Sequence, residues 1–436
     1  MYDRLKGFTD FYPGEMSSRR AIIDTVEGVA AGYGFREIAT PALERVALYV
    51  DKSGPEIVEE LYTFTDKGGR DVALTPELTP TVARMVVARQ QAMSKPIKWY
   101  STRPFWRYEQ VQQGRFREFY QTNIDIFGSD SPAADAEILA VTADFMRELG
   151  VPASEFEFRV SHRDILGGLL RSYAEDVAVQ AAIRTVDKRE KLERDAYLDQ
   201  LQAAGLSEDA AIEFDDVIAD TDAAGLDDVV AAGNDTVAAA VTNLRAVLAA
   251  AADLDAREYC TVSLTTARGF DYYTGVVFEC FDTKDRVSRA IFGGGRYDDL
   301  IESYGGQPTP AVGVAPGVMN STLPLLLEAA GVLPAESVST DYYVLQVGET
   351  RATATRIARD LRARGHVVEG DVADRNFTAQ LEYADSINAE TTVIVGEQDL
   401  AAGEVTVKDM ASGDQTTAPV EAFPGDYDRP TYADFS

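Results

Sequence analysis

Four side chains that could do chemistry stand close together in LTTARGFDYYTGVVFECF, residues 264–281. Arg268, Asp271, Tyr272 and Tyr273 lie within six positions and run directly into an apolar segment at 276–278. An ordinary strand begins with turn-forming residues and one alternating apolar face. A cation, a carboxylate and two phenols at the lip of a buried strand instead indicate a polar binding site.

A second group of ionisable residues lies in STRPFWRYEQVQQGRFREFYQTNIDIFG, residues 101–128, which is typical of two strands joined by a hairpin loop. Arg107 and Glu109 are two residues apart and would share a strand face, while Arg115 follows Gly114 at the loop tip. Guanidinium groups fork onto phosphate oxygens, and the carboxylate could accept the amine of adenine or hold a metal. The group therefore suits a nucleoside triphosphate. The simpler alternative is an ion pair across a solvated hairpin.

The returning strand of this hairpin carries three polar residues at alternate positions, namely Gln121, Asn123 and Asp125. Alternate residues of a strand point to one face, so these side chains should project together. Three polar residues on one face of a strand that otherwise looks buried are hard to explain by packing. We expect this face to line a ligand pocket.

Prolines bracket Glu77, Leu78 and Thr79 in LTPELTPTVAR, residues 74–84. Proline fixes the backbone, so a carboxylate and a hydroxyl would be held rigidly and could bind an ammonium group. The alternative is that Thr79 caps a helix whose first residue is a proline. Both interpretations can hold at once.

The elements that must position these residues change in kind along the chain. The first 150 or so residues mix helices and strands, including a strand over REIATPALE and a helix that begins at Ser131 and Pro132. Residues 160 to 255 are alanine-rich and predict helices only, as in a helical insertion. From about residue 340, strands and helices alternate in the manner of a small α/β domain with a mostly parallel sheet and a closing hairpin.

The composition argues against several classes of protein. No apolar run approaches the roughly 18 residues of a membrane span, and the N-terminus lacks the layout of a signal peptide. The two cysteines allow no disulfide framework, so we expect a cytoplasmic protein without a membrane partner. The two histidines, His162 and His366, are far apart in sequence, which argues against a histidine-based zinc site.

The charge is strongly acidic, at −31 from 41 basic and 72 acidic residues, and only nine of the basic residues are lysines. One interpretation is a well-solvated acidic cytosolic protein. The scarcity of lysine, with arginine retained, favours adaptation to a cytoplasm of molar salt, where the Debye length is about 3 Å. In that setting net charge does not decide whether RNA is a partner.

The motifs REIATPALE, FWRYEQVQQGRFREFYQ, ARGFDYYTGVVFE, GGGRYDDL and TPAVGVAPG occur in the order and spacing of class II histidyl-tRNA synthetases. The chain resembles this family from KGFTDFYPGEM to about residue 420, and its insertion is closer to the archaeal and eukaryotic style. The resemblance implies an α+β fold, with a class II catalytic domain (an antiparallel sheet flanked by helices), a helical insertion and a C-terminal α/β anticodon-binding domain. The expected bounds are 1–160 and 256–332 for the catalytic parts, 161–255 for the insertion, 340–425 for the anticodon-binding domain and 426–436 for a tail.

The resemblance also implies roles at the ATP end of the site. Arg107 would hold the α-phosphate and the adenylate, Arg115 would lie near the β- or γ-phosphate, and Glu109 would face the adenine. Arg268 resembles the catalytic arginine that stabilises charge as the histidine carboxylate attacks the α-phosphate. Pro41 would belong to the dimer interface.

At the histidine end, Glu77, Thr79 and Gln121 would take the amino group. Asp125 and Tyr273 would face the imidazole, with Tyr272 and Tyr297 lining the same pocket.

Two departures from the family pattern concern these sites. Asp125 stands where a glutamate is usual. Met319 and Asn320 stand where the third class II signature ends in glutamate and arginine. Either Arg115 or another group holds the far end of ATP, or ATP activation is impaired.

The implied activity is activation of histidine by ATP, with Mg²⁺, and transfer to the 3′ end of the histidine tRNA. A homodimer without a DNA partner is expected. The alternative is a non-catalytic paralogue, a histidine-sensing regulatory subunit of ATP phosphoribosyltransferase. Such paralogues generally lack the anticodon-type domain.

Overall fold

The computed structural model describes residues 2–50, 59–267 and 272–422 of the 436-residue chain. It divides into two compact units: Met1–Phe11 with Ser18–Pro334, and Tyr12–Ser17 with Ala335–Ser436. The finer division of the first unit into catalytic parts and an insertion remains a prediction.

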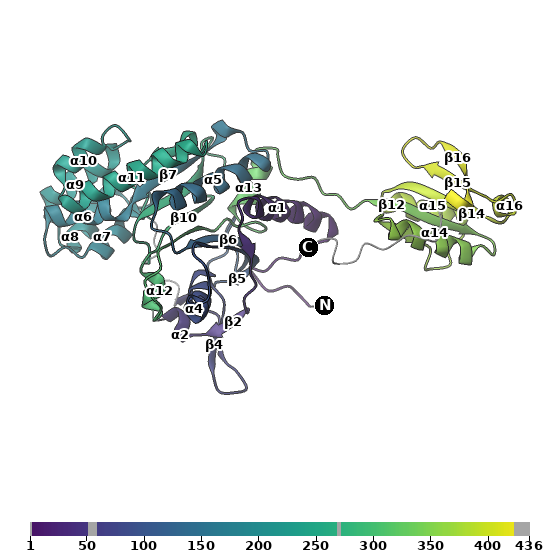
Figure 1. Ribbon diagram of the computed structural model, residues 1–436, viewed down its shortest axis with the longest axis horizontal. Helices are drawn as coiled ribbons and strands as arrows, with labels where there is room; N and C mark the ends of the chain where they lie inside the picture. Colours follow the sequence, from purple (N-terminus) through teal and green to yellow (C-terminus); the bar gives the residue numbers. More distant parts are fainter. Residues whose placement is uncertain (1, 51–58, 268–271, 423–436) are drawn as a thin grey trace. The chain divides into compact units, whose positions relative to one another are not determined.

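An eight-stranded sheet forms the centre of the first unit (Figure 1). In spatial order its strands are β1 (Arg36–Glu37), β5 (Ile97–Trp106), β6 (Glu118–Phe127), β11 (Ala311–Val314), β10 (Phe292–Arg296), β9 (Val276–Asp282), β7 (Phe156–His162) and β8 (Cys260–Val262). The five pairings from β5 to β7 are antiparallel, whereas β1 and β8 join the two edges in parallel. The expected antiparallel sheet is therefore confirmed.

Helices cover this sheet, and a small sheet lies beside it. The helices are α1 (Pro13–Gly32), α2 (Ala47–Val50), α4 (Thr79–Arg89), α5 (Pro132–Glu148), α12 (Leu300–Ser303) and α13 (Thr322–Ala329). The small sheet has the order β2 (Leu43–Arg45), β4 (Asp71–Leu74), β3 (Thr63–Thr65). Short 3₁₀ helices occur at Ala153–Glu155, Arg189–Lys191, Arg257–Tyr259 and Val420–Ala422.

Two local predictions in this unit have different outcomes. The helix α5 begins as expected, because the Ser131 hydroxyl accepts a hydrogen bond from the backbone N–H of Ala133. The strand over REIATPALE is much shorter than expected. The regular part of β1 covers two residues, and only the Ile38 N–H adds a further bond to Tyr100 before the chain leaves the sheet.

Between residues 163 and 253 the chain forms helices, as the alanine-rich composition predicts. They are α6 (Arg163–Tyr173), α7 (Val179–Val186), α8 (Arg194–Ala203), α9 (Glu208–Asp220), α10 (Leu226–Ala232) and α11 (Asp235–Asp253). By length and composition α11 could cross a membrane. Its Val241, Leu244 and Val247 are buried, however, and the helix packs against α5 and α6. That arrangement is typical of a core helix.

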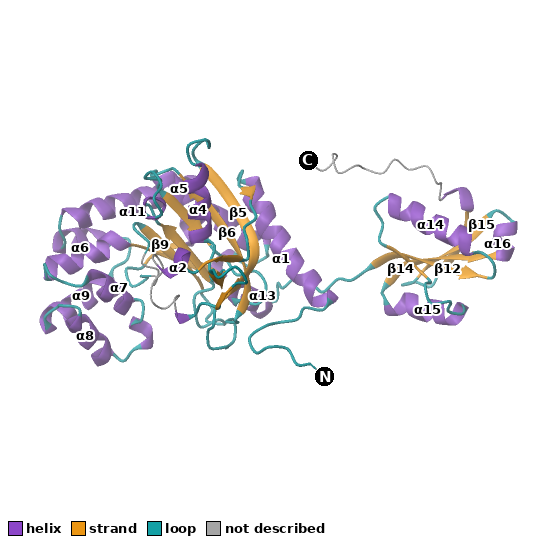
Figure 2. Ribbon diagram, turned by 90° about the horizontal axis from the view of Figure 1, so that it is seen from below, coloured by secondary structure: helices purple, strands orange, loops and turns teal. Residues whose placement is uncertain are grey.

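The second unit is an α/β domain with a five-stranded sheet. Its strand order is β13 (Val368–Gly370), β12 (Thr340–Val347), β14 (Ala389–Gly396), β15 (Glu404–Asp409), β16 (Gln415–Pro419). The first three strands are parallel and the last two form the predicted hairpin. The helices α14 (Arg351–Ala363) and α15 (Phe377–Ser386) cover opposite faces, as Figure 2 shows, and α16 (Glu397–Ala401) precedes β15.

Candidate active site

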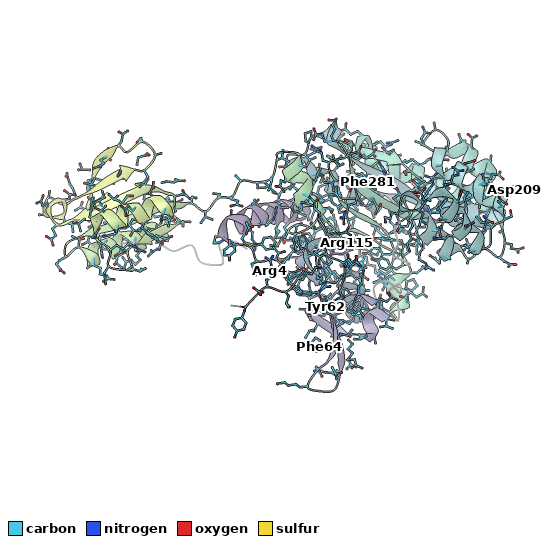
Figure 3. All side chains as sticks on the ribbon, turned by 180° about the vertical axis from the view of Figure 1, so that it is seen from behind. Arg4, Tyr62, Phe64, Arg115, Asp209 and Phe281 are labelled. Atoms are coloured by element: carbon cyan, nitrogen blue, oxygen red, sulfur yellow. The ribbon has the colours of Figure 1, made fainter. Side chains whose placement is uncertain are left out.

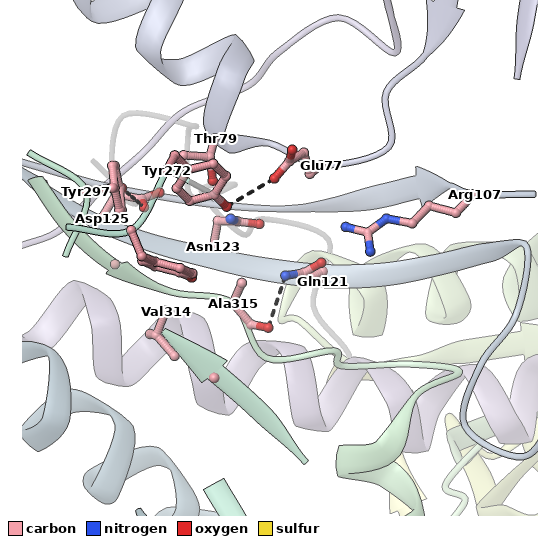
Figure 4. A pocket seen from close by; sticks show the side chains of 13 residues that line it. Glu77, Thr79, Arg107, Gln121, Asn123, Asp125, Tyr272, Tyr297, Val314 and Ala315 are labelled. Carbon is pink, nitrogen blue, oxygen red and sulfur yellow. Dashed lines mark hydrogen bonds between the residues drawn. The ribbon is translucent and has the colours of Figure 1, made fainter. Parts of the chain in front are cut away.

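Polar side chains from several segments of the first unit meet in one pocket (Figure 4). The pocket encloses about 420 Å³, part of it open to solvent. Its polar lining consists of Glu77, Thr79, Arg107, Gln121, Asn123, Asp125, Tyr272, Tyr273 and Tyr297. Eight of these nine residues are among those that the family resemblance assigns to the site, and Asn123 was expected here from the alternation of the strand alone.

The floor of the pocket is set by β6 and its neighbour β11. Gln121, Asn123 and Asp125 alternate along β6 and line the pocket together, as their spacing predicts. Asp125 pairs in register with Gly313 of β11. A Cβ atom at position 313 would come within 2.1 Å of the Asp125 Oδ1 atom, so only glycine leaves room for the carboxylate.

Asp125 is buried and accepts a short hydrogen bond from the Tyr297 hydroxyl. Burial raises the pKa of Asp125 to about 7, while the bond from Tyr297 lowers it. The hydroxyl that reaches Asp125 comes from Tyr297. The role of Tyr273, which was expected to face the imidazole together with Asp125, stays a prediction. Tyr273 contacts Tyr297 edge-on, with ring centroids 6.4 Å apart.

The mouth of the pocket is held by Glu77 and Gln121. The Tyr272 hydroxyl donates to Glu77 Oε2 at 3.1 Å, and Gln121 Nε2 donates to the Ala315 carbonyl at 3.0 Å. The Gln121 amide is thereby turned so that its oxygen remains as an acceptor on the other side. Carboxylate and amide oxygens of this kind are suitable acceptors for an ammonium group.

The prediction that Thr79 caps a helix is wrong. Thr79 is the first residue of α4, and the capping position is occupied by Leu78, which makes no side-chain cap. Thr79 is buried and lines the pocket instead.

Asn123 presents a buried polar atom to the pocket. Its Oδ1 atom is buried and has no hydrogen-bond partner among the described residues. A buried acceptor without a partner is costly, which favours a ligand group that donates to it. The alternation of β6 indicated the direction of Asn123, but the carry-over from the family did not include it.

An arginine cluster lies beside the pocket. β5 ends at Trp106, so the prediction that Arg107 and Glu109 share a strand face is wrong. The two residues still approach, with Arg107 Nη1 3.8 Å from Glu109 Oε1, and Arg115 Nε lies 2.9 Å from Glu109 Oε2. Arg107 also donates from Nε to the Pro76 carbonyl at 3.0 Å, which joins the cluster to the segment that holds Glu77. Glu109 and Arg115 pair with each other and do not line the pocket.

The predicted catalytic arginine and a possible metal site remain to be located. Arg268 and its neighbour Asp271 lie outside the described residues. Within residues 2–50, 59–267 and 272–422, no group of three or more His, Cys, Asp or Glu side chains is placed to hold a metal ion.

The comparisons with known proteins agree with this geometry. A family model described as histidyl-tRNA synthetase matches residues 7–320, and one described as an anticodon binding domain matches residues 341–425. The chain belongs to the histidyl-tRNA synthetase family. The resemblance inferred from the ordered motifs is thus confirmed.

Other members of the histidyl-tRNA synthetase family match the whole chain. The histidine–tRNA ligase of Halobacterium salinarum is 67% identical and that of Natronomonas pharaonis 66% identical, each over 100% of both chains. The histidine–tRNA ligase of Pyrococcus furiosus is 37% identical over 97% of each. The two relatives at 66–67% identity come from haloarchaea, in agreement with the acidic composition of this chain.

Solved structures of histidyl-tRNA synthetases share the fold. The crystal structure of histidyl-tRNA synthetase from Nostoc sp. PCC 7120 has a TM-score of 0.80 at 24% identity, covering 97% of this chain and 98% of the other. A Bacillus halodurans protein described as an ATP phosphoribosyltransferase regulatory subunit/histidyl-tRNA synthetase has a TM-score of 0.74 at 21% identity, covering 91% and 98%. At these identities the likeness concerns the fold alone, and it confirms the expected combination of catalytic and anticodon-binding domains.

Proposed function

We propose that this protein activates histidine with ATP and transfers the histidyl group to the 3′ end of the histidine tRNA. The observation that carries the proposal is the pocket itself. Its floor holds the Asp125–Tyr297 pair and the Asn123 amide oxygen, which has no partner in the described part of the chain. Its mouth holds carboxylate and amide acceptors, with Arg107 beside them. The full-length match to histidine–tRNA ligases supports the same activity.

The floor of the pocket suits an imidazole ring. Ionised Asp125 accepts an N–H from the ring on the oxygen that Tyr297 leaves available, and Asn123 offers a second acceptor or donor. A site built from buried polar groups rejects analogues that cannot satisfy them by large factors. Glu77, Thr79 and Gln121 then take the amino group at the mouth, which directs the substrate carboxylate toward Arg107.

Adenylate formation follows from this placement. A carboxylate oxygen of histidine attacks the α-phosphorus of ATP, the new carbon–oxygen–phosphorus bridge forms, and the bond to the oxygen shared with the β-phosphate breaks. Pyrophosphate leaves with that oxygen. Arg107 neutralises the α-phosphate, and Arg268 is assigned, on the family resemblance, to the charge that develops during attack. A hydroxyl at the 3′ end of the tRNA then displaces AMP.

Mg²⁺ would be held mainly by the ATP phosphates and would neutralise part of their charge. The carboxylate nearest the arginine cluster, Glu109, is already paired with Arg115 and Arg107. The described side chains therefore do not form a dedicated magnesium cage, and the ATP phosphates would be the main ligands of the ion.

The second unit is assigned the role of binding the anticodon end of the tRNA. The protein is assigned to the cytoplasm.

We assign a homodimer contact to the Pro41 segment and the adjoining small sheet. Pro41 accepts a bond from Arg103 Nη1 at 2.8 Å, and Phe64 of β3 is exposed there (Figure 3). Light scattering in molar KCl should give twice the mass of one chain.

The alternative, a histidine-sensing regulatory subunit of ATP phosphoribosyltransferase, is less well supported. The anticodon-binding model matches residues 341–425, and the relatives that match the full chain at 66–67% identity are histidine–tRNA ligases.

Histidine-dependent exchange of labelled pyrophosphate into ATP tests the proposal. The assay should run from low to multimolar KCl with magnesium, across a panel of amino acids. We expect exchange with histidine alone. Absence of exchange at every salt concentration, with histidine still bound by calorimetry, would establish the regulatory alternative.

A further inference from the structure

Position 320 raises a question about ATP that the pocket does not answer. Asn320 is buried, and its Nδ2 atom donates to the backbone carbonyl of Glu118 at 2.5 Å. A short amide that is bound to the start of β6 cannot supply a cation to the far end of a triphosphate. If ATP is a substrate, another side chain must neutralise that end.

Arg289 lies beside the hairpin loop that carries Arg115. It belongs to the connection between β9 and β10, and its Nη2 atom donates to the backbone carbonyl of Gln113 at 2.7 Å. Gln113 adjoins Gly114 and Arg115 in the β5–β6 hairpin loop, 176 residues away in sequence. This contact brings Arg289 beside the arginine cluster described above.

The electrostatic surroundings place Arg289 close to the same cluster. Burial lowers the pKa of Arg289, Arg115 lowers it further, and Glu109 raises it. Arg107, Arg115 and Arg289 thus gather around one carboxylate, in a chain where acidic residues outnumber basic ones by 72 to 41. Guanidinium groups that converge in this way are typical of a phosphate-binding site.

The connection that carries Arg289 is held firmly at its base. Asp282 accepts from the backbone N–H groups of Lys284 and Arg286, and Arg286 Nη2 lies 2.8 Å from Asp282 Oδ1. Arg286 Nη1 also pairs with Glu155 at 2.7 Å. The connection is therefore built to present Arg289 in a defined place.

The hairpin loop, the β9–β10 connection and the chain after β11 meet at Thr322. The Thr322 hydroxyl donates to the Ile291 carbonyl, and a Cβ atom at Gly114 would lie 3.1 Å from the Thr322 Cγ2 atom. Gly114 itself has φ +70°, a conformation that glycine adopts readily. Arg289 therefore contacts the hairpin loop, and Asn320 contacts Glu118 at the start of the strand that follows that loop.

We propose that Arg289 binds the terminal phosphates of ATP, supplying from the β9–β10 connection the cation that position 320 lacks. The proposal deepens the proposed function and rests on it. In this role Arg289 contacts the pyrophosphate part of ATP and makes no contact with AMP or histidine. Its loss should therefore weaken only ligands that carry the outer phosphates.

The test compares R289A, R289K and the wild-type protein in molar KCl with magnesium. K284A serves as the matched control, because it removes one positive charge from the same connection at an exposed position. Calorimetry gives the affinities for ATP and AMP, and pyrophosphate exchange gives the KM values for ATP, pyrophosphate and histidine. We expect R289A to weaken ATP and pyrophosphate by about tenfold or more, which is about 1.4 kcal/mol. AMP and histidine should change by less than about twofold, R289K should recover part of the loss, and K284A should behave as wild type.

Two results would overturn the proposal. Unchanged ATP affinity in R289A would remove Arg289 from the site. An equal loss for ATP, AMP and histidine, with a lower melting temperature, would assign Arg289 to loop structure alone. Absence of exchange in the wild-type protein would instead contradict the proposed function, and the comparison of ATP with AMP binding would still decide the role of Arg289.

Discussion

Asp125 is the residue whose ionisation should govern histidine binding. Its pKa is raised to about 7 by burial, so the carboxylate is mainly protonated at pH 6 and mainly ionised at pH 8. The ionised form accepts the imidazole N–H, and the protonated form loses that acceptor. We expect the KM for histidine to fall by about tenfold between pH 6 and pH 8, in proportion to the ionised fraction. Pyrophosphate exchange in molar KCl measures it.

The imidazole of free histidine titrates near pH 6.5 and contributes its own pH dependence. The D125N variant isolates the contribution of the protein, because it keeps an acceptor for Tyr297 and cannot ionise. We expect its KM to be higher by on the order of 100-fold and its pH profile to be flatter. An equally steep profile in D125N would contradict the assignment.

The same carboxylate should lower the stability of the ligand-free protein at alkaline pH. The unfolded chain loses the Asp125 proton near the ordinary carboxyl pKa of 3.8, while the folded protein keeps it to about pH 7. The folded state binds more protons in this window, so the free energy of unfolding falls as the pH rises from about 4 to about 7. We expect D125N to be more stable than wild type at pH 8, by at most about 4 kcal/mol, since one pKa unit is about 1.4 kcal/mol. Chemical unfolding at pH 5 and pH 8 should show this difference shrinking at the lower pH.

At the scale of elements, α5 and β10 are joined by a buried ion pair. Arg296 Nη2 lies 2.5 Å from Asp135 Oδ2, and Arg296 Nη1 lies 3.0 Å from Asp298 Oδ1. Removing one partner of a buried pair leaves the other charge uncompensated, so R296M should lose about 3–5 kcal/mol of unfolding free energy. The double variant R296M/D135L should recover much of that loss. Because Arg296 precedes Tyr297, R296M should also raise the KM for histidine. If the double variant loses as much unfolding free energy as the two single variants together, Arg296 and Asp135 are not coupled.

At the scale of the whole molecule, the net charge of −31 dominates the response to salt. The Debye length falls from about 10 Å at 0.1 M salt to about 3 Å at 1 M, so repulsion between surface carboxylates is screened. We expect the melting temperature to rise by on the order of 10 °C between 0.1 M and 2 M KCl, equivalent to several kcal/mol. Sucrose at low salt, which supplies no ions, should not reproduce this rise. A melting temperature independent of KCl would exclude adaptation to molar salt.

The amino-acid sequence by itself determined whatever depends on short-range periodicity or on the order of motifs. The alternation of Gln121, Asn123 and Asp125 predicted one polar face, because successive strand residues point to opposite sides of a sheet. Ser131 and Pro132 predicted the start of α5, because a helix start is set by its first few residues. The ordered motifs from the N-terminal region to residue 420 identified the family.

Only the tertiary structure decided which distant groups meet. Tyr297 reaches Asp125 across 172 residues of sequence, and Arg289 reaches Gln113 across 176. Neither contact can be predicted from neighbouring residues in the sequence, because each depends on how β6, β9, β10 and β11 pair. The Asn123 oxygen, which has no partner among the residues that the structure describes, and the bond from Asn320 to β6 likewise follow from burial within that sheet. Sequence patterns report the direction of a side chain, whereas its partner is set by the packing of the whole sheet.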